Sequence, residues 1–474
     1  MVKQNEAPNA CAVRSRAPTF ADFDTPSAPM PKYPLAAVPL VSPMAAVYAG
    51  RMTDATDRQL AAQYEAFPYP RRDPRDEAKR LVVGSPGHLL EVDHWVFGSL
   101  RPAEMPLNAL IAGGGTGDAT LMLAQQMARD GRPGTVTWLD RSAAAMRIAQ
   151  SRASVRALSN IAWEQRSLLD LPGSGLGPFD YIDCCGVLHH LPDPAAGLRA
   201  LTSVLAPDGG IGLMVYAPHG RTGVYMIQDA LHLLAPPEQP PAKRLDTARR
   251  LMRHLPETAW LRHNRNFDDH INGGDAGLYD LLLNPRDRAF TVPQLHDMLS
   301  GAGLRPTCWV EPLRYDPTPL LPDPRLRDRL ASLDPTRRAA LAEALAGNMA
   351  VHIVYCVRTD NTVPPADPFA LDAVPVCREV TGDTLAQGIR PDGTMMVGLD
   401  GLQLPVALPP LAGAILRQVD GRRTVADIAA ALAAASISAE AFGRAWPATF
   451  IALERINRLL LAAPRPRDQA PSGA

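Results

Sequence analysis

The sequence predicts an α/β protein in which helices cover both faces of a doubly wound, mostly parallel sheet, followed by a small α+β domain. After Glu104, short apolar runs alternate with stretches of helical periodicity. One of these runs leads directly into a glycine-rich turn that opens a helix. At 474 residues the chain is also long enough for more than one domain.

Seven apolar runs are the predicted strands, and the spacing between them fits helical crossovers. They are Ala109–Ala112, Val136–Asp140, Ile161–Glu164, Tyr181–Cys185 and Ile211–Tyr216, with two more near Pro306–Val310 and Val351–Val357. Two of the helices expected between them are Ala119–Arg129 and Ala195–Leu205.

Changes in composition divide the chain into segments. We expect a disordered tail at 1–50, a helical strap or lid at 51–104, and the sheet domain at 105–358 with helical insertions at about 218–288 and 316–347. A linker at 359–368, an accessory domain at 369–463 and a tail at 464–474 complete the prediction.

The overall charge excludes some partners. Lys and Arg number 48 and Asp and Glu 49, so no net field draws the protein to DNA or to an anionic membrane. The first residues lack the apolar stretch of a signal peptide, and no run of about 18 apolar residues occurs. We therefore expect a cytoplasmic protein.

The strongest motif is the turn from Leu110 to Asp118. Glycines at positions 113, 115 and 117 let the backbone approach a ligand closely, and the following helix offers free N–H groups. A nicotinamide dinucleotide site would need a third glycine where this chain has Asp118 or Thr120. An acid at 118 would repel a pyrophosphate, whereas a cationic sulfonium ligand could tolerate it.

Two acids follow at positions that suit a bound nucleoside. Asp140 ends the second strand, where such folds place an acceptor for both ribose hydroxyls. Asp170 follows the third strand and could accept from an adenine amino group while Leu168 packs on the ring. The structural alternatives are a helix N-cap for Asp140 and a turn acid for Asp170.

The segment from Phe179 to Pro194, FDYIDCCGVLHHLPDP, and the turn LAPDGG that begins at Leu205 complete the set of motifs. In this order and spacing they resemble class I S-adenosylmethionine-dependent methyltransferases, which have a Rossmann-like fold. The resemblance implies S-adenosylmethionine as cofactor. It also implies that the cofactor-binding residues are Gly113, Gly115, Gly117, Asp118, Asp140, Arg141, Leu168, Asp170 and Gly186, with His189 beside Gly186 at the reaction mouth.

One position departs from the family pattern. Members often carry an acid two residues before the first glycine, which helps to hold the methionine amino group, but this chain has Ile111 there. Asp118 or a backbone carbonyl would have to substitute. The stretch from Tyr64 to Arg71 is similar to the YxxxPYPR sequence of one bacterial group of these enzymes, where it would lie as a lid beside the donor. Alternatively, this segment is a strap that packs its aromatic residues on the sheet.

Methyl transfer from a sulfonium needs alignment more than proton transfer, so a general base is optional. Histidine is the natural base near neutral pH, and the carboxyl ends of the fourth and fifth strands are where open sheets bind ligands. The candidates there are His189, His190, Tyr216 and His219.

No metal site is predicted. His254, His263 and His270 lie in sequence near Asp268 and Asp269, but no pair has a ligand spacing.

The C-terminal segment loosely resembles a winged-helix module. From residue 360 on it carries about ten basic and twelve acidic residues, which disfavours nucleic-acid binding and leaves peptide docking or a homodimer. The methyl acceptor stays open between a protein or peptide and a small molecule, with RNA third. The rival hypothesis is a non-catalytic adaptor that keeps the cofactor fold and acts through its last domain.

Overall fold

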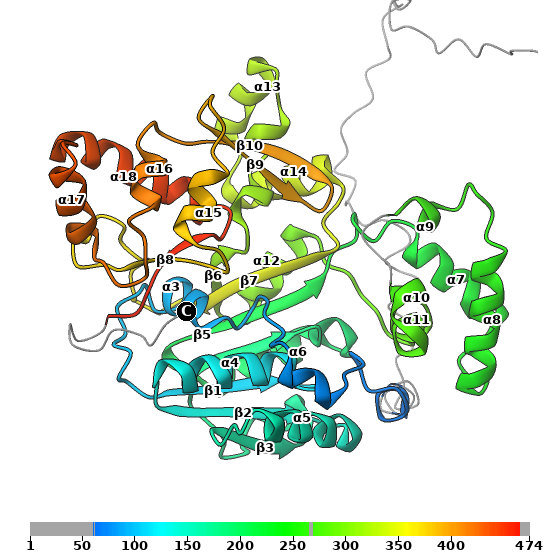
Figure 1. Ribbon diagram of the computed structural model, residues 1–474. Helices are drawn as coiled ribbons and strands as arrows, with labels where there is room; N and C mark the ends of the chain where they lie inside the picture. Colours follow the sequence, from blue (N-terminus) through cyan, green and yellow to red (C-terminus); the bar gives the residue numbers. More distant parts are fainter. Residues whose placement is uncertain (1–59, 61, 265–268, 465–474) are drawn as a thin grey trace, which may run out of the picture. The chain divides into compact units, whose positions relative to one another are not determined.

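A seven-stranded sheet lies at the centre of the described chain (Figure 1). The computed structural model describes residues 60, 62–264 and 269–464. The strand order is β3-β2-β1-β4-β5-β7-β6, and β7 runs antiparallel to both of its neighbours while the other pairs are parallel. The strands are β1 (Leu107–Ala112), β2 (Gly134–Asp140), β3 (Ile161–Gln165), β4 (Phe179–Cys185), β5 (Leu205–Tyr216), β6 (Leu304–Trp309) and β7 (Val351–Arg358).

The predicted fold class is therefore confirmed, and each predicted strand is present. One helix boundary differs: the helix expected at Ala195–Leu205 is α6 (Pro194–Ser203), and Leu205 already belongs to β5. The reason is that Leu205 pairs with Phe179 before the ladder shifts its register. The LAPDGG turn is thus part of a long, irregular strand.

Helices cover both faces of the sheet. On one face, α3 (Leu89–Trp95), α4 (Asp118–Asp130) and α5 (Ala143–Val155) bury the apolar side chains of the first strands. On the other face, α6 and α12 (Val292–Gly301) cover the alternate positions. Strand β1 is buried on both sides, as expected for a parallel strand between two helical layers.

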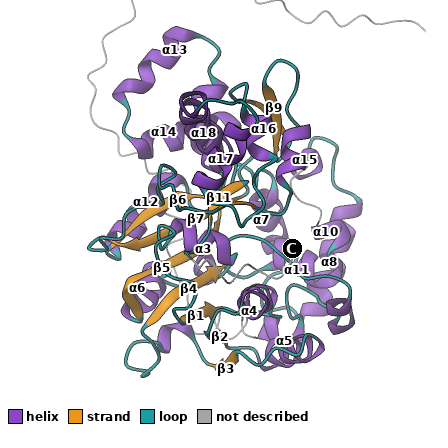
Figure 2. Ribbon diagram, turned by 60° about the vertical axis from the view of Figure 1, so that its left-hand side comes forward, coloured by secondary structure: helices purple, strands orange, loops and turns teal. Residues whose placement is uncertain are grey.

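The two insertions are helical, as the sequence predicts. The first packs around its own small core and contains α7 (Val224–Leu234), α8 (Pro241–Arg253), α9 (Trp260–His263), α10 (Asp269–Asn272) and α11 (Gly274–Leu283). In Figures 1 and 2 its helices α8, α10 and α11 lie together beside the sheet. The second contains α13 (Pro324–Asp328) and α14 (Pro335–Ala346), with 3-10 turns η5 (Thr318–Leu320) and η6 (Arg329–Ser332) around α13.

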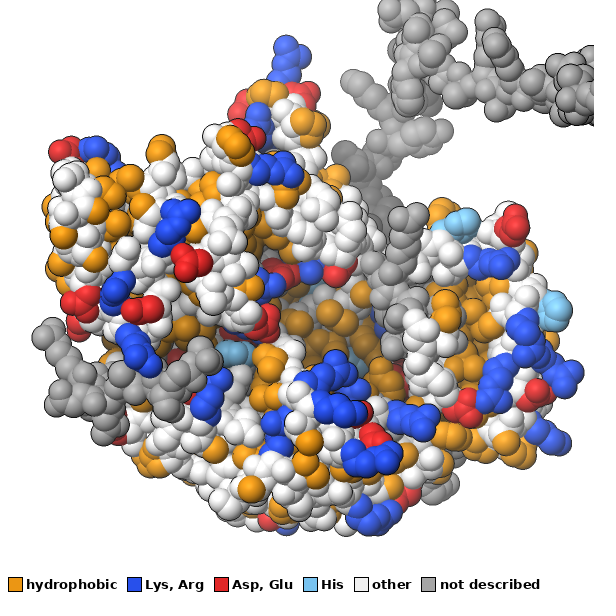
Figure 3. All heavy atoms as spheres, viewed as in Figure 1, with side chains coloured by type: hydrophobic (Ala, Val, Ile, Leu, Met, Phe, Trp, Pro, Cys, Tyr) orange, Lys and Arg blue, Asp and Glu red, His pale blue; other side chains and the backbone are white. Residues whose placement is uncertain are grey.

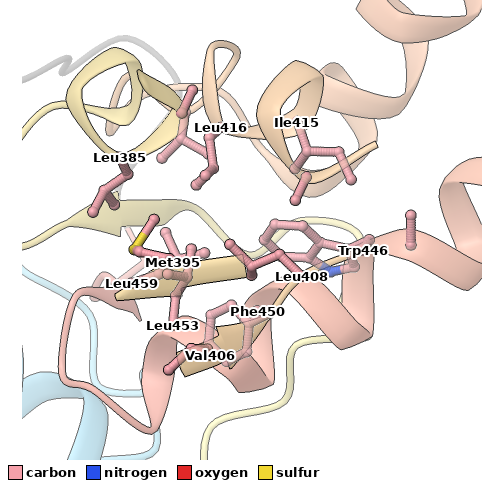
Figure 4. Close-up of a cluster of buried hydrophobic side chains, with 14 of the residues drawn as sticks. Leu385, Met395, Val406, Leu408, Ile415, Leu416, Trp446, Phe450, Leu453 and Leu459 are labelled. Carbon is pink, nitrogen blue, oxygen red and sulfur yellow. The ribbon is translucent and has the colours of Figure 1, made fainter. Parts of the chain in front are cut away.

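The C-terminal segment has a hydrophobic core of its own, part of which Figure 4 shows. Side chains from its helices and from a β-hairpin point toward one another there, with Trp446 and Phe450 among them. Its elements are β8 (Pro375–Cys377), α15 (Gly382–Gln387), β9 (Thr394–Leu399), β10 (Leu402–Ala407), α16 (Ala412–Leu416), α17 (Val425–Ala434), α18 (Ala439–Glu454) and β11 (Leu459–Leu461). β9 pairs with β10, and β8 with β11, both antiparallel.

The C-terminal segment contacts the sheet domain through α3. The fully buried carboxylate of Glu91 accepts from Tyr355 Oη at 2.7 Å and from Asn457 Nδ2 at 2.7 Å, and it lies 2.6 Å from Arg378 Nε. One turn later, His94 accepts from the backbone N–H of Leu461. A single helix of the sheet domain therefore bonds to both ends of the C-terminal segment.

Replacing Glu91 by Ala is expected to destabilise the protein by about 3–5 kcal/mol, because the Arg378 guanidinium would stay buried without its carboxylate. Urea unfolding followed by circular dichroism measures this change. Glu440→Ala is the control, since Glu440 forms an exposed pair with Arg444 on α18 and its loss should change little. Equal effects of the two substitutions would contradict the structural role of Glu91.

Candidate functional site

The glycine turn between β1 and α4 has the conformation that its sequence predicts. Gly113 has φ of 82° and Gly117 has φ of 104°, values that residues with a Cβ rarely adopt. A Cβ at Gly113 would lie 2.2 Å from Val187, in the loop after β4. The turn is therefore packed directly against the end of the fourth strand, where Gly186 also has a positive φ.

Asp140 holds this turn in place. Its Oδ2 accepts from the backbone N–H of Gly115 at 2.9 Å, and its Oδ1 accepts from that of Ser142 at 2.9 Å. Burial raises the pKa of the Asp140 carboxyl, while these backbone N–H groups act in the opposite direction. Each carboxylate oxygen has a further lone pair, so the group can still accept two ribose hydroxyls. Asp140 is not the N-cap of α5, because Ser142 has that role.

A segment preceding the sheet crosses the glycine turn. We call residues 62–80 the strap; they include a helical stretch at 62–66 and the 3-10 helix η1 (Pro74–Ala78). Thr116 donates its hydroxyl to the carbonyl of Pro70 at 2.8 Å, and the carbonyl of Tyr69 lies beside Gly115. Figure 3 shows Lys and Arg side chains gathered over the strap, next to a hollow lined by hydrophobic side chains.

Buried charges fasten the strap to the turn. Arg152 on α5, whose side chain is 1% exposed, donates to Glu77 of the strap at 2.8 Å and to the carbonyl of Thr116 at 2.8 Å. It also donates to Asp118 at 2.7 Å, and Arg72 binds the same carboxylate through two nitrogens. The guanidinium of Arg152 thus connects the strap, the glycine turn and α5.

These contacts bear on the expectation that Asp118 or a backbone carbonyl substitutes for the missing acid at Ile111. Both oxygens of Asp118 are bound by guanidinium groups, so a donor ammonium would have to compete with two cations. Burial raises the pKa of the Asp118 carboxyl. The bonds and charges of Arg72 and Arg152 together lower it by more than this, so the resulting pKa lies below the ordinary value. Asp118 therefore helps to hold the turn in place. A backbone carbonyl remains the predicted partner of the amino group in the methionine part of the donor.

The predicted histidines and Tyr216 come together at the ends of β4 and β5. The ring of Tyr216 is stacked between His189, with ring centroids 3.8 Å apart, and the guanidinium of Arg221, 3.7 Å from the Tyr216 centroid. His189 is fully buried, and burial holds its pKa well below the usual range. Its Nδ1 accepts from the backbone N–H of Tyr216. His189 is thus a neutral packing residue that orients the tyrosine.

A carboxylate from the first insertion completes this group. Asp280 on α11 accepts from Tyr64 Oη of the strap at 3.0 Å and lies 3.5 Å from Tyr216 Oη. Asn284 lies 3.4 Å from both the Asp280 carboxylate and the Tyr64 hydroxyl. His190 packs edge-on against Tyr64 and donates from its Nδ1 to the carbonyl of Arg286 at 2.7 Å. We call Tyr64, Tyr216, Asp280 and Asn284 the acid cluster.

Other predicted residues lie outside these two groups. His219 is exposed in the loop after β5, and Arg141 is exposed after β2. Leu168 packs in the core beneath α6, so the exposed apolar side chain of that turn is Leu169 instead. Asp170 is exposed at the end of the 3-10 helix η2 (Leu168–Asp170). Their cofactor contacts stay predictions.

Sequence reasoning missed Asp280 and Arg152. Both look like ordinary helix residues, and their partners are distant in the sequence: Asp280 and Tyr64 are 216 residues apart. The only available signal was the YxxxPYPR stretch itself, since Tyr64 belongs to it. Of the suggested metal group, His270 and the two acids carry no described side chains, and the described residues contain no cluster of three potential ligands.

A cavity of about 580 Å³ lies along the edge strand β6 and not at the glycine turn. Trp95, Trp309 and Tyr315 are among its lining residues. It lies beyond β7, which separates it from β4 and β5 in the sheet order. No helix among the described residues has the length and apolar character needed to cross a membrane.

Arg152→Met is expected to destabilise the protein by about 3–5 kcal/mol at pH 7, because two carboxylates would lose their buried cation. The depressed pKa of Asp118 stabilises the fold above the ordinary pKa, about 4, and this contribution is lost as the pH falls through the lower folded value. The difference in the free energy of unfolding between the variant and the wild type should therefore become smaller towards pH 3. Urea unfolding at pH 7 and at pH 3 tests this, and a difference independent of pH would argue against the ion pairs.

Comparisons with known proteins identify the fold and the family of the chain. Residues 110–211 match the family model of the methyltransferase domain. A protein of Synechococcus sp. is 30% identical over 301 residues, which cover 62% of this chain and 70% of its own length. The ubiquinone biosynthesis O-methyltransferase of Albidiferax ferrireducens is 34% identical over 90 residues, which cover 19% of this chain and 35% of that protein.

Among solved structures, PKMT2 from Rickettsia typhi in complex with AdoHcy superposes with a TM-score of 0.57 at 16% identity. The superposition covers 80% of this chain and 76% of the other, so the shared fold extends beyond the methyltransferase domain. The matching family model and the shared fold lead to one assignment. The chain belongs to the class I S-adenosylmethionine-dependent methyltransferases.

Proposed function

We propose that the protein transfers the methyl group of S-adenosylmethionine to an acceptor that enters over the carboxyl ends of β4 and β5. The observation that carries this proposal is the position of the acid cluster at the loop next to the donor-binding turn. In open α/β sheets this edge is where ligands bind. The acceptor is a protein, a peptide or a small molecule.

The donor side fits the cofactor. Gly113, Gly115 and Gly117 have no side chains to keep a ligand from the backbone of the turn, and Asp140 retains lone pairs for two hydroxyls. When bound, the cofactor supplies an electrophilic methyl group on a sulfonium. The chain has to hold the donor, align the acceptor nitrogen, oxygen or sulfur atom, and exclude water.

The acceptor side can also take a proton. Tyr64 and Tyr216 present hydroxyl groups to the Asp280 carboxylate, and the stack of His189 and Arg221 fixes the orientation of Tyr216. Asp280 is the carboxylate of this group, and burial raises its pKa, which favours acceptance of a proton. The strap covers the region, since Glu65 bonds to Ser142 next to Asp140 while Tyr64 reaches the insertion.

The names of the relatives do not identify the acceptor. The match to the ubiquinone biosynthesis enzyme of Albidiferax ferrireducens covers a fifth of this chain, so its substrate cannot be transferred to the present protein. The adaptor hypothesis is disfavoured, because an adaptor would not need a buried carboxylate and two tyrosines at the reaction edge.

For the C-terminal segment we infer a role in docking a peptide or a second copy of the chain. The exposed side chains of Phe369, Leu371 and Ile451 support this proposal. The winged-helix resemblance and the relation to the YxxxPYPR group also remain proposals. The strap contacts at Pro70 and Arg72 favour a lid beside the donor.

Asp140→Ala should weaken the binding of S-adenosylhomocysteine about a hundredfold, because it removes both the ribose acceptor and the anchor of Gly115. Isothermal calorimetry measures the affinity, with NAD as a negative ligand. Asp208→Ala is the control, since Asp208 is exposed near the start of β5, away from the turn. Unchanged binding in the Asp140 variant would place the donor elsewhere.

The acceptor class is tested with a radioactive methyl donor and a cell extract divided into protein, RNA and small-molecule fractions. We expect label in the protein or the small-molecule fraction, because the Asp280 carboxylate of the acid cluster does not suit a polyanion. The Asp140→Ala variant is the blank. Label predominantly in RNA would overturn this part of the proposal.

A further inference from the structure

Asp280 is a buried carboxylate whose direct partners in the described chain are all neutral. Its side chain accepts from the hydroxyl of Tyr64 and contacts the amide of Asn284 and the hydroxyl of Tyr216. Asp280 itself is 5% exposed. Taking an ionised carboxylate out of water costs several kcal/mol unless a cation compensates it. Burial raises the pKa of the Asp280 carboxyl, and these hydrogen bonds come from neutral groups, so a bound cation would stabilise its ionised form.

The nearby cations are engaged with other groups. Arg221 forms a buried ion pair with Asp287 at 2.7 Å, and its guanidinium stacks on the face of Tyr216. Arg244 donates to the carbonyl of Ala235 and to another tyrosine hydroxyl. The His190 ring bonds to a backbone carbonyl on one side and lies close enough to Asp280 to interact electrostatically. None of these side chains is hydrogen-bonded to Asp280 in the described structure.

We propose that the cation that stabilises Asp280 belongs to the substrate, and that the methyl acceptor is a primary amine that enters as an ammonium ion. Asp280 would bind the ammonium, with the hydroxyls of Tyr64 and Tyr216 beside it. This inference rests on the proposed function and specifies its substrate class.

The aromatic rings favour the same ligand. Tyr64, Tyr216 and His190 lie around the carboxylate, with Tyr64 and His190 edge to face at 6.2 Å. The faces of the Tyr216 ring are occupied by His189 and Arg221, so of the two tyrosines only Tyr64 can offer a ring face, which attracts an ammonium group most strongly where water is excluded. An anionic acceptor, by contrast, would meet the Asp280 carboxylate and be repelled.

The chemistry is balanced. The bound ammonium first gives one proton to the Asp280 carboxylate, which leaves a neutral amine and a carboxylic acid. The amine lone pair then forms the new N–C bond while the S–C bond electrons pass to sulfur, which leaves as a neutral thioether. The product is a methylammonium ion, and Asp280 returns its proton to solvent when the product departs.

The test uses three acceptor probes with the full-length protein. Nα-acetyl-lysine methylamide carries the amine, and the analogous 6-hydroxynorleucine derivative differs only in having a hydroxyl. Poly-L-lysine offers the same amine on a polypeptide. Methylation is read by mass spectrometry, and binding of each small probe to the S-adenosylhomocysteine complex is read by calorimetry. The expected result is methylation of at least one amine probe, and binding of the amine at least about tenfold tighter than the hydroxyl analogue.

Asp280→Asn keeps the shape of the side chain but removes its charge. It should raise the KM for the amine about tenfold or more while leaving the affinity for S-adenosylhomocysteine unchanged. Asp275→Asn is the matched control, because Asp275 lies on the same helix but forms an exposed pair with Arg249. This control should behave like the wild type.

The outcomes separate this inference from the proposed function. If S-adenosylhomocysteine binds but no amine probe is methylated, or if the hydroxyl analogue binds equally well, the amine proposal is overturned and donor binding stands. An unchanged KM in Asp280→Asn would overturn it as well. If S-adenosylhomocysteine does not bind, the proposed function fails, and this inference fails with it.

Discussion

The buried guanidinium of Arg152 joins three segments that are far apart in the sequence. It bonds to Glu77 in the strap, to Asp118 at the start of α4, and to the carbonyl of Thr116 in the glycine turn. A guanidinium is planar and has five donors, so one group can satisfy all three partners. Because a buried charge is tolerated only when it is fully paired, the strap and the turn have to be assembled together.

This coupling extends to the acceptor side. The strap that Arg152 holds also supplies Tyr64 to the acid cluster and Glu65 to the backbone after Asp140. The donor and acceptor surfaces consequently share one covering segment. An altered position of the strap would affect the glycine turn, Asp140 and Tyr64 at once, so under the proposed function methyl transfer would depend on contacts that touch neither ligand.

The sheet and the donor side could be predicted because their signals are local. Alternating apolar runs locate the strands. The turn needs a positive φ at Gly113 and Gly117, and the glycines that allow it are visible in a short sequence motif. The acid cluster could not be predicted in this way. It forms when an insertion, a strap and two strand ends meet in three dimensions, and Asp280 carries no pattern that separates it from other helical acids. The role of Asp118 could not be predicted from its position in the motif either, because it depends on the ion pairs with Arg72 and Arg152.

The antiparallel direction of β7 determines where the C-terminal segment departs. Because β7 runs opposite to its neighbours, Arg358 at its end lies at the amino edge of the parallel strands, away from Gly113 and Tyr216. The C-terminal segment begins from that side and contacts the sheet domain at α3. The hairpin of the same segment bonds through the carbonyls of Leu399 and Asp400 to Asn348, just before β7 begins beside Tyr216. The C-terminal segment is thus attached at both edges of the sheet, so a change in its length or packing also reaches the edge that carries Tyr216.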